Sequence, residues 1–266
     1  MNTKLKETIT LTFGESAENH KGMQVLGSIA SRGITITELA TVKSQFEKLG
    51  FQCQIYDLTT IPMLAATNST SNTPNTLPQK LEPAQLLIIK SAITNSAEVY
   101  EEQMRFPRDT KALMYGRVVN KKARHNLCFS DFDQAPDYTS GKGTVINFCR
   151  TPLLAAIRAS LPEITKLPQL VALQCEANYY YDTSKTYIGW HGDSERRIVV
   201  GIRLGATFPL HYRWYHKGAP ISQVLTLSLE DGDMYIMSDK ATGNDWKYSS
   251  RPTLRHAAGD LKWIDK

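Results

Sequence analysis

The first hundred residues mix two hydrophobic periodicities. Residues 9–13 alternate as a strand does, and residues 36–49 carry apolar side chains at helical spacing, with Gly50 just past them where a helix commonly ends. The same criteria predict strands at 51–58 and 85–91 and helices at 23–29 and 98–105. Residues 59–83 are crowded with Thr, Asn, Ser and Pro, which predicts a flexible loop. We therefore expect a small α/β unit over residues 1–107.

The second part of the chain has a different pattern. After a helical stretch at 153–161, nearly every hydrophobic run is short, rich in aromatic or β-branched residues, and bounded by turn signals. Strands are predicted at 171–181, 188–191, 197–204, 208–215, 224–229, 234–237 and 253–257. This spacing predicts a double-sheet jelly roll or barrel over residues 108–266. The expected fold class is α+β, with a double-stranded β-helix (jelly-roll) core beside the small N-terminal α/β unit.

Composition narrows the class of protein. The chain has 266 residues, 41% of them hydrophobic and 21% charged, which excludes a fibrous or wholly disordered protein. The cysteines are scattered without a CxxC pair, so neither a disulfide framework nor a zinc ribbon is indicated. No run of eighteen apolar residues occurs and the first residues lack a secretory signal pattern, so we expect no membrane partner and a cytoplasmic or nuclear location. The net charge of +5 permits an anionic partner.

One segment carries the pattern of a metal site. His191 ends a predicted strand and Asp193 follows two positions later. In an extended strand, residues i and i+2 project to the same face, so both side chains can reach one metal ion. His256 ends a distant predicted strand and can supply a further ligand. Two imidazoles and one carboxylate form the facial triad of non-haem Fe(II) oxygenases. The alternatives are a surface His–Asp pair with an unrelated histidine, a cupin-like protein that binds metal without redox chemistry, or a catalytically inactive binding module.

Residues 111–266 resemble the AlkB-like branch of the Fe(II)- and 2-oxoglutarate-dependent dioxygenases. Asn178-Tyr179-Tyr180 matches the family's Asn-x-Tyr, and residues 188–195 are similar to its core strand, including the acidic Glu195 after the aspartate. Arg203-Leu-Gly falls where the family has Ser-Leu-Gly, and residues 232–237 match its Gly-Asp-x-x-x-Met. The segment 240–253 is an insertion relative to the family pattern.

The resemblance implies the cofactors and their ligands. Fe(II) would be bound by the triad, with 2-oxoglutarate and O2 as co-substrates, and Asn178 and Tyr180 would hold the carboxylates of 2-oxoglutarate. The family's arginine beyond the distal histidine is absent here. Lys262 is our first choice for the distal carboxylate, because residues 257–260 resemble a tight turn and Lys262 would begin the next strand. An inward-facing Arg203 or Arg197, or the terminal Lys266, could substitute.

The stretch 110–130 indicates the substrate. It contains no acidic residue and places cations beside aromatic side chains, a combination suited to phosphate contacts and base stacking. In AlkB-like enzymes the matching region is a nucleotide-recognition lid. We assign substrate binding to Arg117, Lys121, Lys122, Arg124 and Glu195, and expect DNA, RNA or a nucleotide to be hydroxylated or demethylated. The alternatives are a basic surface loop, or hydroxylation of a protein side chain or a small metabolite. The oligomeric state is left open.

Overall fold

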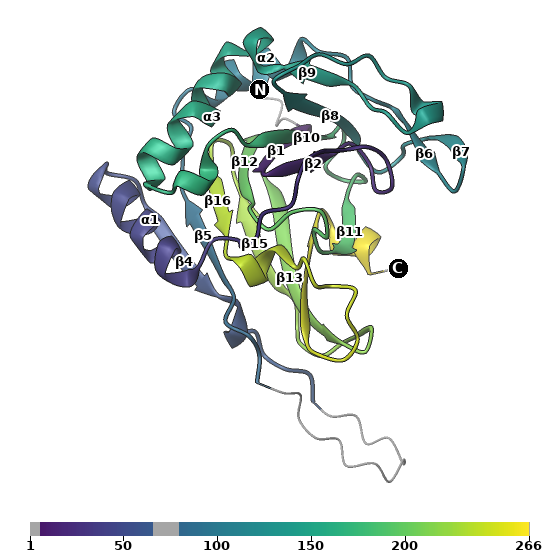
Figure 1. Cartoon of the computed structure of the whole chain (residues 1–266). Helices are drawn as coiled ribbons and strands as arrows, with labels where there is room; N and C mark the ends of the chain where they lie inside the picture. Colours follow the sequence, from purple (N-terminus) through teal and green to yellow (C-terminus); the bar gives the residue numbers. More distant parts are fainter. Residues whose placement is uncertain (1–5, 66–79, 266) are drawn as a thin grey trace.

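The computed structural model describes residues 6–65 and 80–265. It shows a mixed α/β protein composed mostly of strands, with few helices (Figure 1). In the described residues no helix is both long enough and apolar enough to span a membrane. Most of the predicted loop at 59–83 lies outside the described residues, which stop at 65 and resume at 80. Of its described part, Leu58–Thr60 (η1) forms a short 3-10 turn and Met63 bridges to Ser222.

The larger sheet combines strands from both parts of the chain. Its strands are antiparallel to their neighbours except for one parallel pair, β8 and β9. In spatial order they are β4 (Cys53–Asp57), β5 (Gln85–Ile89), β16 (Met234–Met237), β12 (Val200–Gly205), β1 (Thr8–Gly14), β10 (Gln174–Tyr180), β8 (His125–Ser130) and β9 (Val145–Asn147).

The smaller sheet comes from the second part alone. Its strands are β11 (Ile188–His191), β17 (Thr253–Ala258), β13 (Phe208–His216) and β14 (Ala219–Pro220), and β15 (Leu225–Leu229) also pairs with β13. Two hairpins complete the strands, β2 (Ser16–Glu18) with β3 (Val25–Gly27) and β6 (Lys111–Met114) with β7 (Arg117–Asn120). The strands predicted in the second part of the sequence are thereby confirmed.

Hydrophobic packing holds these elements in layers. The helices α1 (Ile36–Lys48), α2 (Ser96–Met104) and α3 (Pro152–Thr165) share one buried cluster with the larger sheet, and Figure 1 shows α1 and α3 on one side of it. A second cluster joins the two sheets, with Ile88 and Val199 from the larger-sheet region against Tyr212 and Trp214 of β13. The remaining elements are the short 3-10 turns η2 (Tyr138–Ser140), η3 (Phe148–Arg150), η4 (Pro168–Leu170) and η5 (Asp239–Thr242), and the short helix α4 (Leu261–Ile264) after the last strand.

The expected separation into an N-terminal unit and a catalytic domain at residue 107 is wrong for the sheet. β1 lies between β10 and β12, and β5 pairs with β16, so strands from residues 1–107 are internal to a sheet of residues 108–266. A local hydrophobic pattern predicts that a strand forms but does not say which strand it pairs with. Pro107 therefore marks no boundary in the hydrogen-bonded sheet.

Local predictions in the first part hold with one exception. The helix expected at 36–49 is α1, and a capping box between Thr35 and Glu38 fixes its start. The helix expected at 23–29 is wrong, because β3 lies there instead and pairs with β2. Leu26 packs against Ala17 and Cys128, so long-range packing overrides the helical spacing at this site.

Candidate metal centre

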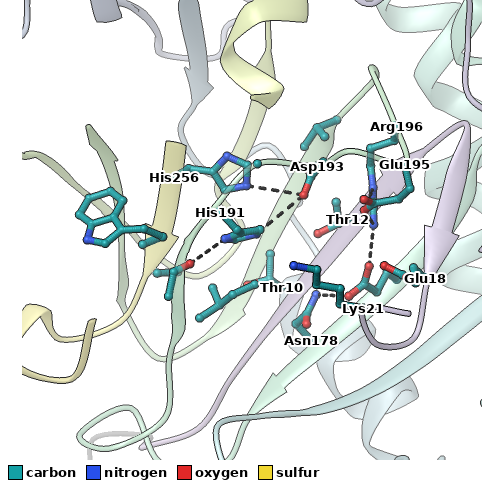
Figure 2. Close-up of a pocket in the computed structure, with 18 of the residues that line it drawn as sticks. Thr10, Thr12, Glu18, Lys21, Asn178, His191, Asp193, Glu195, Arg196 and His256 are labelled. Atoms are coloured by element: carbon teal, nitrogen blue, oxygen red, sulfur yellow. Dashed lines mark hydrogen bonds and ion pairs between the residues drawn. The ribbon is translucent and has the colours of Figure 1, made fainter. Parts of the chain in front are cut away.

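A cavity of about 670 Å³ lies between the two sheets. It draws side chains from both ends of the chain, and Figure 2 shows His191, Asp193 and His256 on one side and Glu18, Glu195 and Arg196 on the other. The polar residues that line it include Thr10, Thr12, Glu18, Lys21, Arg124, Glu176, Asn178, Tyr180, His191, Asp193, Glu195, Arg196, Arg203, Trp246 and His256. The cavity therefore contains most, but not all, of the predicted site residues.

The structure brings the predicted metal ligands together. His191 on β11 and His256 on β17 are direct partners across the strand pair, and Asp193 follows β11 by two residues. The Oδ1 atom of Asp193 lies 3.8 Å from Nε2 of His191 and 3.7 Å from Nε2 of His256. One ligand atom from each residue lies within 4.8 Å of the others. These separations are too long for hydrogen bonds but suit atoms that share a cation.

The protonation states also suit metal ligation. Burial lowers the pKa of His191 and holds the pKa of His256 well below its usual value, so both imidazoles are neutral near pH 7. Burial raises the pKa of Asp193, because the charged carboxylate has lost water. The Nδ1 atom of His191 lies 2.8 Å from the carbonyl oxygen of Gly189, which orients the ring. A divalent cation would compensate the buried carboxylate.

Arg203 is a fully buried cation of this cavity and has no anionic partner among the described residues. Its side chain projects from β12 and is 1% exposed. One terminal nitrogen donates to the Thr10 hydroxyl, Nε has no hydrogen-bond partner, and the guanidinium forms no ion pair with a carboxylate of the described residues. Burial lowers the pKa of Arg203, and the ring of Phe208 lies 5.1 Å from the guanidinium carbon. A buried cation without a counter-charge is costly, so the site favours an anionic ligand.

Tyr180 and Asn178 both line the cavity but differ in the contacts that their side chains already make. Tyr180 is 2% exposed and its ring packs against Phe208, while it lines the same cavity as Arg203. The Asn178 side-chain oxygen accepts from Nε of Arg124 at 2.5 Å and from Asn126 at 2.7 Å, and its amide nitrogen donates to Glu176 at 2.9 Å. One amide hydrogen of Asn178 remains for a ligand.

Buried ion pairs form the wall opposite the predicted ligands. Arg196 donates to Glu176 at 2.7 Å and to Glu195 at 2.9 Å, and the Arg196 side chain is 3% exposed. These carboxylates and Asp193 raise the pKa of Arg196 well above its usual value. Glu18, which accepts from the amide of Gly22, has a pKa raised to about 7 because it is buried. Glu195 thus faces the cavity as expected, but an arginine already binds it.

The expectation that Lys262 anchors a carboxylate in the cavity is wrong. Lys262 lies on α4, not on a strand, because the side chain of Asp260 accepts from its amide and starts a helix. Its ammonium binds Asp260 at 2.9 Å, its side chain is 57% exposed, and it does not line the cavity. Arg197 also turns elsewhere, donating to Asp239 at 2.6 Å. Lys266 lies outside the described residues.

The predicted phosphate contacts divide into three kinds. Arg117 and Lys122 are exposed, and Tyr115 at the tip of the β6–β7 hairpin is 99% exposed. Arg124 lines the cavity, and its Nε donates a hydrogen bond to the side-chain oxygen of Asn178. Lys121 is an internal structural cation, so assigning it to phosphate is wrong. It donates to Asn19 at 2.7 Å and to Asn126 at 2.9 Å, and burial lowers its pKa to about 8.

Several residues line the cavity at positions that the sequence did not predict. Thr10 and Glu18 belong to the part of the chain expected to form a separate unit, and they reach the cavity only because β1 inserts between β10 and β12. Trp246 belongs to the segment expected to be an insertion, and its Nε1 donates to Ser194 beside Asp193 at 3.1 Å. The aromatic and acidic character of these residues was visible in the sequence, but their position depended on long-range pairing.

Fold and site together define a mixed α/β protein with a His/Asp/His group, His256 buried and His191 partly exposed, inside a cavity between two sheets. The chain is 44% identical over 268 residues to a protein named "Uncharacterized protein R156" of Acanthamoeba polyphaga mimivirus. The match covers 98% of this chain and 99% of that protein, so the chain belongs to the same protein family. No protein-family model matches the chain.

Proposed function

We propose that this protein is an Fe(II)- and 2-oxoglutarate-dependent dioxygenase that hydroxylates or demethylates a nucleic-acid base or a nucleotide. One observation carries the proposal: a His/Asp/His group and a buried, unpaired arginine line the same cavity. The first is a set of metal ligands and the second is a carboxylate site. A dicarboxylic co-substrate that chelates a metal needs both.

The residues present fit these cofactors. His191, Asp193 and His256 would hold Fe(II), because their ligand atoms converge and both imidazoles are neutral. Fe(II) and 2-oxoglutarate would supply the oxidation in which O2 gives a hydroxylated product, succinate and CO2. Arg203 would bind the distal carboxylate, with the Thr10 and Tyr180 hydroxyls beside it. The buried walls of the cavity would keep the reacting carbon away from water.

The proposal includes the way in which the two sheets enclose the cavity. We propose that the two sheets around the cavity form a double-stranded β-helix. The antiparallel pairs β11–β17 and β17–β13 on one side and β1–β10 and β1–β12 on the other support it. Each sheet contributes side chains to the cavity between them. In this arrangement the two histidines would bind the metal from the smaller sheet, Asp193 from the loop after β11, and Arg203 would bind the carboxylate from the larger sheet.

The exposed basic and aromatic residues near the cavity support a nucleic-acid substrate. Lys21 and Lys247 lie against the ring of Trp246, with 5.1 and 6.0 Å between each ammonium nitrogen and the ring centroid. All three line the cavity, and both lysines are exposed. Outside the residues that line the cavity, the β6–β7 hairpin carries the exposed Arg117 and the exposed ring of Tyr115. Cations can contact phosphates here while aromatic rings stack on bases.

The first test is the wild-type reaction. Succinate formation that requires Fe(II), 2-oxoglutarate and O2 together is expected, even without a primary substrate. A protein that binds a divalent metal but produces no succinate under any of these conditions would be a non-redox metal protein, and the proposal would fail.

The second test separates the classes of substrate. Affinity for single-stranded oligonucleotides should fall with salt, and replacing Arg117 and Lys122 together by Ala should reduce the slope of log affinity against log salt by about one to two units. Lys48→Ala on the exposed face of α1 is the matched control. Absence of salt-sensitive oligonucleotide binding, with succinate formation intact, would reject nucleic acid and leave protein side chains or small metabolites.

A further inference from the structure

The segment between β16 and β17 packs directly against the loop that carries Asp193. It begins as η5 (Asp239–Thr242), turns at Gly243 and continues through Trp246 to β17. The backbone N–H of Asp193 donates to the carbonyl of Thr242 at 3.0 Å. One residue further along the loop, the Ser194 hydroxyl accepts from Nε1 of Trp246 at 3.1 Å. The segment therefore contacts the loop through backbone and side chain.

Gly192, between the two ligands His191 and Asp193, is in contact with the same turn. A Cβ atom on Gly192 would lie 2.0 Å from the carbonyl oxygen of Gly243 and 2.9 Å from Cβ of Trp246. Gly243 has a φ of +66°, and a Cβ atom there would lie 2.5 Å from the carbonyl oxygen of Leu254. Leu254 lies on β17, the strand that carries His256. The turn therefore lies between the Asp193 loop and the strand of the distal histidine.

The three ligands are held by different means. His191 and His256 are paired in register across β11 and β17, so the strand ladder sets their spacing. β11 ends at His191 and its register shifts between Ile188 and His191, so Asp193 lies beyond the ladder. The hydrogen bond from its amide goes to Thr242 and not to a strand. Nothing in the β11–β17 pair therefore fixes the position of the carboxylate.

We propose that Thr242, Gly243 and Trp246 position Asp193 against the two histidines, and that Gly192 is required because no side chain fits beneath this turn. The inference rests on the proposed metal site. It gives the segment 240–253, which looks like an insertion in the sequence, a role in assembling that site. A positioning role differs from simple stabilisation, because it requires the metal-bound geometry to change when the fold stays intact.

The experiment compares variants in their affinity for Co(II), measured by calorimetry, and in the visible spectrum of the bound Co(II), which reports coordination number and geometry. Gly192→Ala should weaken Co(II) binding by about 10–100-fold and change the spectrum, as loss of a positioning contact does at metal sites. Trp246→Phe, which removes only the hydrogen bond to Ser194 and keeps an aromatic ring, should weaken binding severalfold with a smaller spectral change. Melting temperatures of the metal-free proteins show whether each variant is folded.

Gly50→Ala is the control for the glycine. Gly50 follows α1 outside the cavity lining, with a φ of +89° and no atom within 4 Å of an added Cβ, so this variant can lower stability but should keep the Co(II) affinity and spectrum of the wild type. Tyr248→Ala is the control for Trp246→Phe, since this ring belongs to the same segment but is 60% exposed. If Gly192→Ala fails to fold, Trp246→Phe and its control decide.

The outcomes separate the two proposals. Wild-type affinity and spectrum in both Gly192→Ala and Trp246→Phe, with Co(II) binding lost in His191→Ala, would overturn the positioning role and leave the metal site intact. Wild-type protein that binds no Co(II) at all would overturn the proposed function itself. A lower melting temperature with an unchanged spectrum would show that the segment only stabilises the fold.

Discussion

The two sheets around the cavity contribute to it in different ways. The smaller sheet is built entirely from residues 188–258 and supplies His191 and His256 from neighbouring strands. The larger sheet combines β1 with β10 and β12, and it supplies Thr10, Tyr180 and Arg203. The metal ligands are thus assembled locally, whereas the anion site depends on a strand from the other end of the chain.

Asp193→Ala should abolish 2-oxoglutarate turnover. It removes one of three ligands and leaves two neutral imidazoles without the compensating carboxylate. Because even outer-shell substitutions cost about 10–100-fold in metal affinity, loss of a ligand should cost more. Succinate formation and Co(II) calorimetry measure the effect, with His216→Ala at the end of β13 as control. Wild-type turnover in Asp193→Ala would remove this residue from the site.

Leu11→Ala tests whether the two parts of the chain unfold together. Leu11 on β1 is fully buried, so its truncation should cost about 2–5 kcal/mol. All the tryptophans lie beyond residue 189, so their fluorescence follows the unfolding of the second part, together with the contact that Trp214 makes with Leu58. Urea unfolding followed by this fluorescence should show the full destabilisation, because β1 is internal to the larger sheet. Ile29→Ala, at a 53% exposed position, should change stability by no more than about 0.5 kcal/mol.

An unchanged fluorescence transition in Leu11→Ala, with a shifted circular dichroism transition, would contradict this comparison. It would mean that the first part unfolds separately, and the division at residue 107 would then describe folding even though it does not describe the sheet.

Arg203→Met should raise the Michaelis constant for 2-oxoglutarate more than it lowers the maximal rate. A hydrogen-bonded pair that includes a charge contributes about 1.5–3 kcal/mol, which corresponds to about 10–150-fold. Arg203→Lys should recover part of the affinity, since a point charge lacks the bidentate geometry. Lys262→Ala is the control, because that lysine is exposed and bound to Asp260. A large effect at Lys262 with none at Arg203 would reverse the assignment.

Glu18→Gln should have the smallest effect, a stabilisation that grows with pH. Burial raises the pKa of Glu18 to about 7 from its usual 4.5, so the wild-type protein loses stability as the pH rises from 4.5 through 7. Since this carboxyl is partly exposed to water, the variant should be more stable than the wild type by about 1 kcal/mol at pH 8. The variant should gain little at pH 5. Urea unfolding at both pH values measures the difference, and an equal gain at both would show that the charge of Glu18 is not responsible.

The local elements and the candidate metal ligands could be predicted from the order of the residues alone. Two-residue alternation predicted the strands. The His-x-Asp spacing predicted that His191 and Asp193 lie close together, and they do, although β11 ends at His191 and Asp193 follows it in a loop. The pairing with His256 followed once that residue was expected on a strand. The strands and the His-x-Asp pair were predicted without any distant contact. The assignment of His256 assumed one such contact, the pairing of β17 with β11.

The residues that surround those ligands could not be predicted in the same way, because they come from distant parts of the chain. Lys262 and Arg203 were both cations of suitable type, and the sequence favoured Lys262 because a strand was expected after Asp260. The side chain of Asp260 caps a short helix there instead, while β1 buries Arg203 between the sheets. Lys121 likewise has the sequence context of a surface cation, but in the structure it donates to Asn19 of the β2–β3 loop. Burial and charge compensation depend on which distant strands pair, and periodicity within one segment carries no information about that choice.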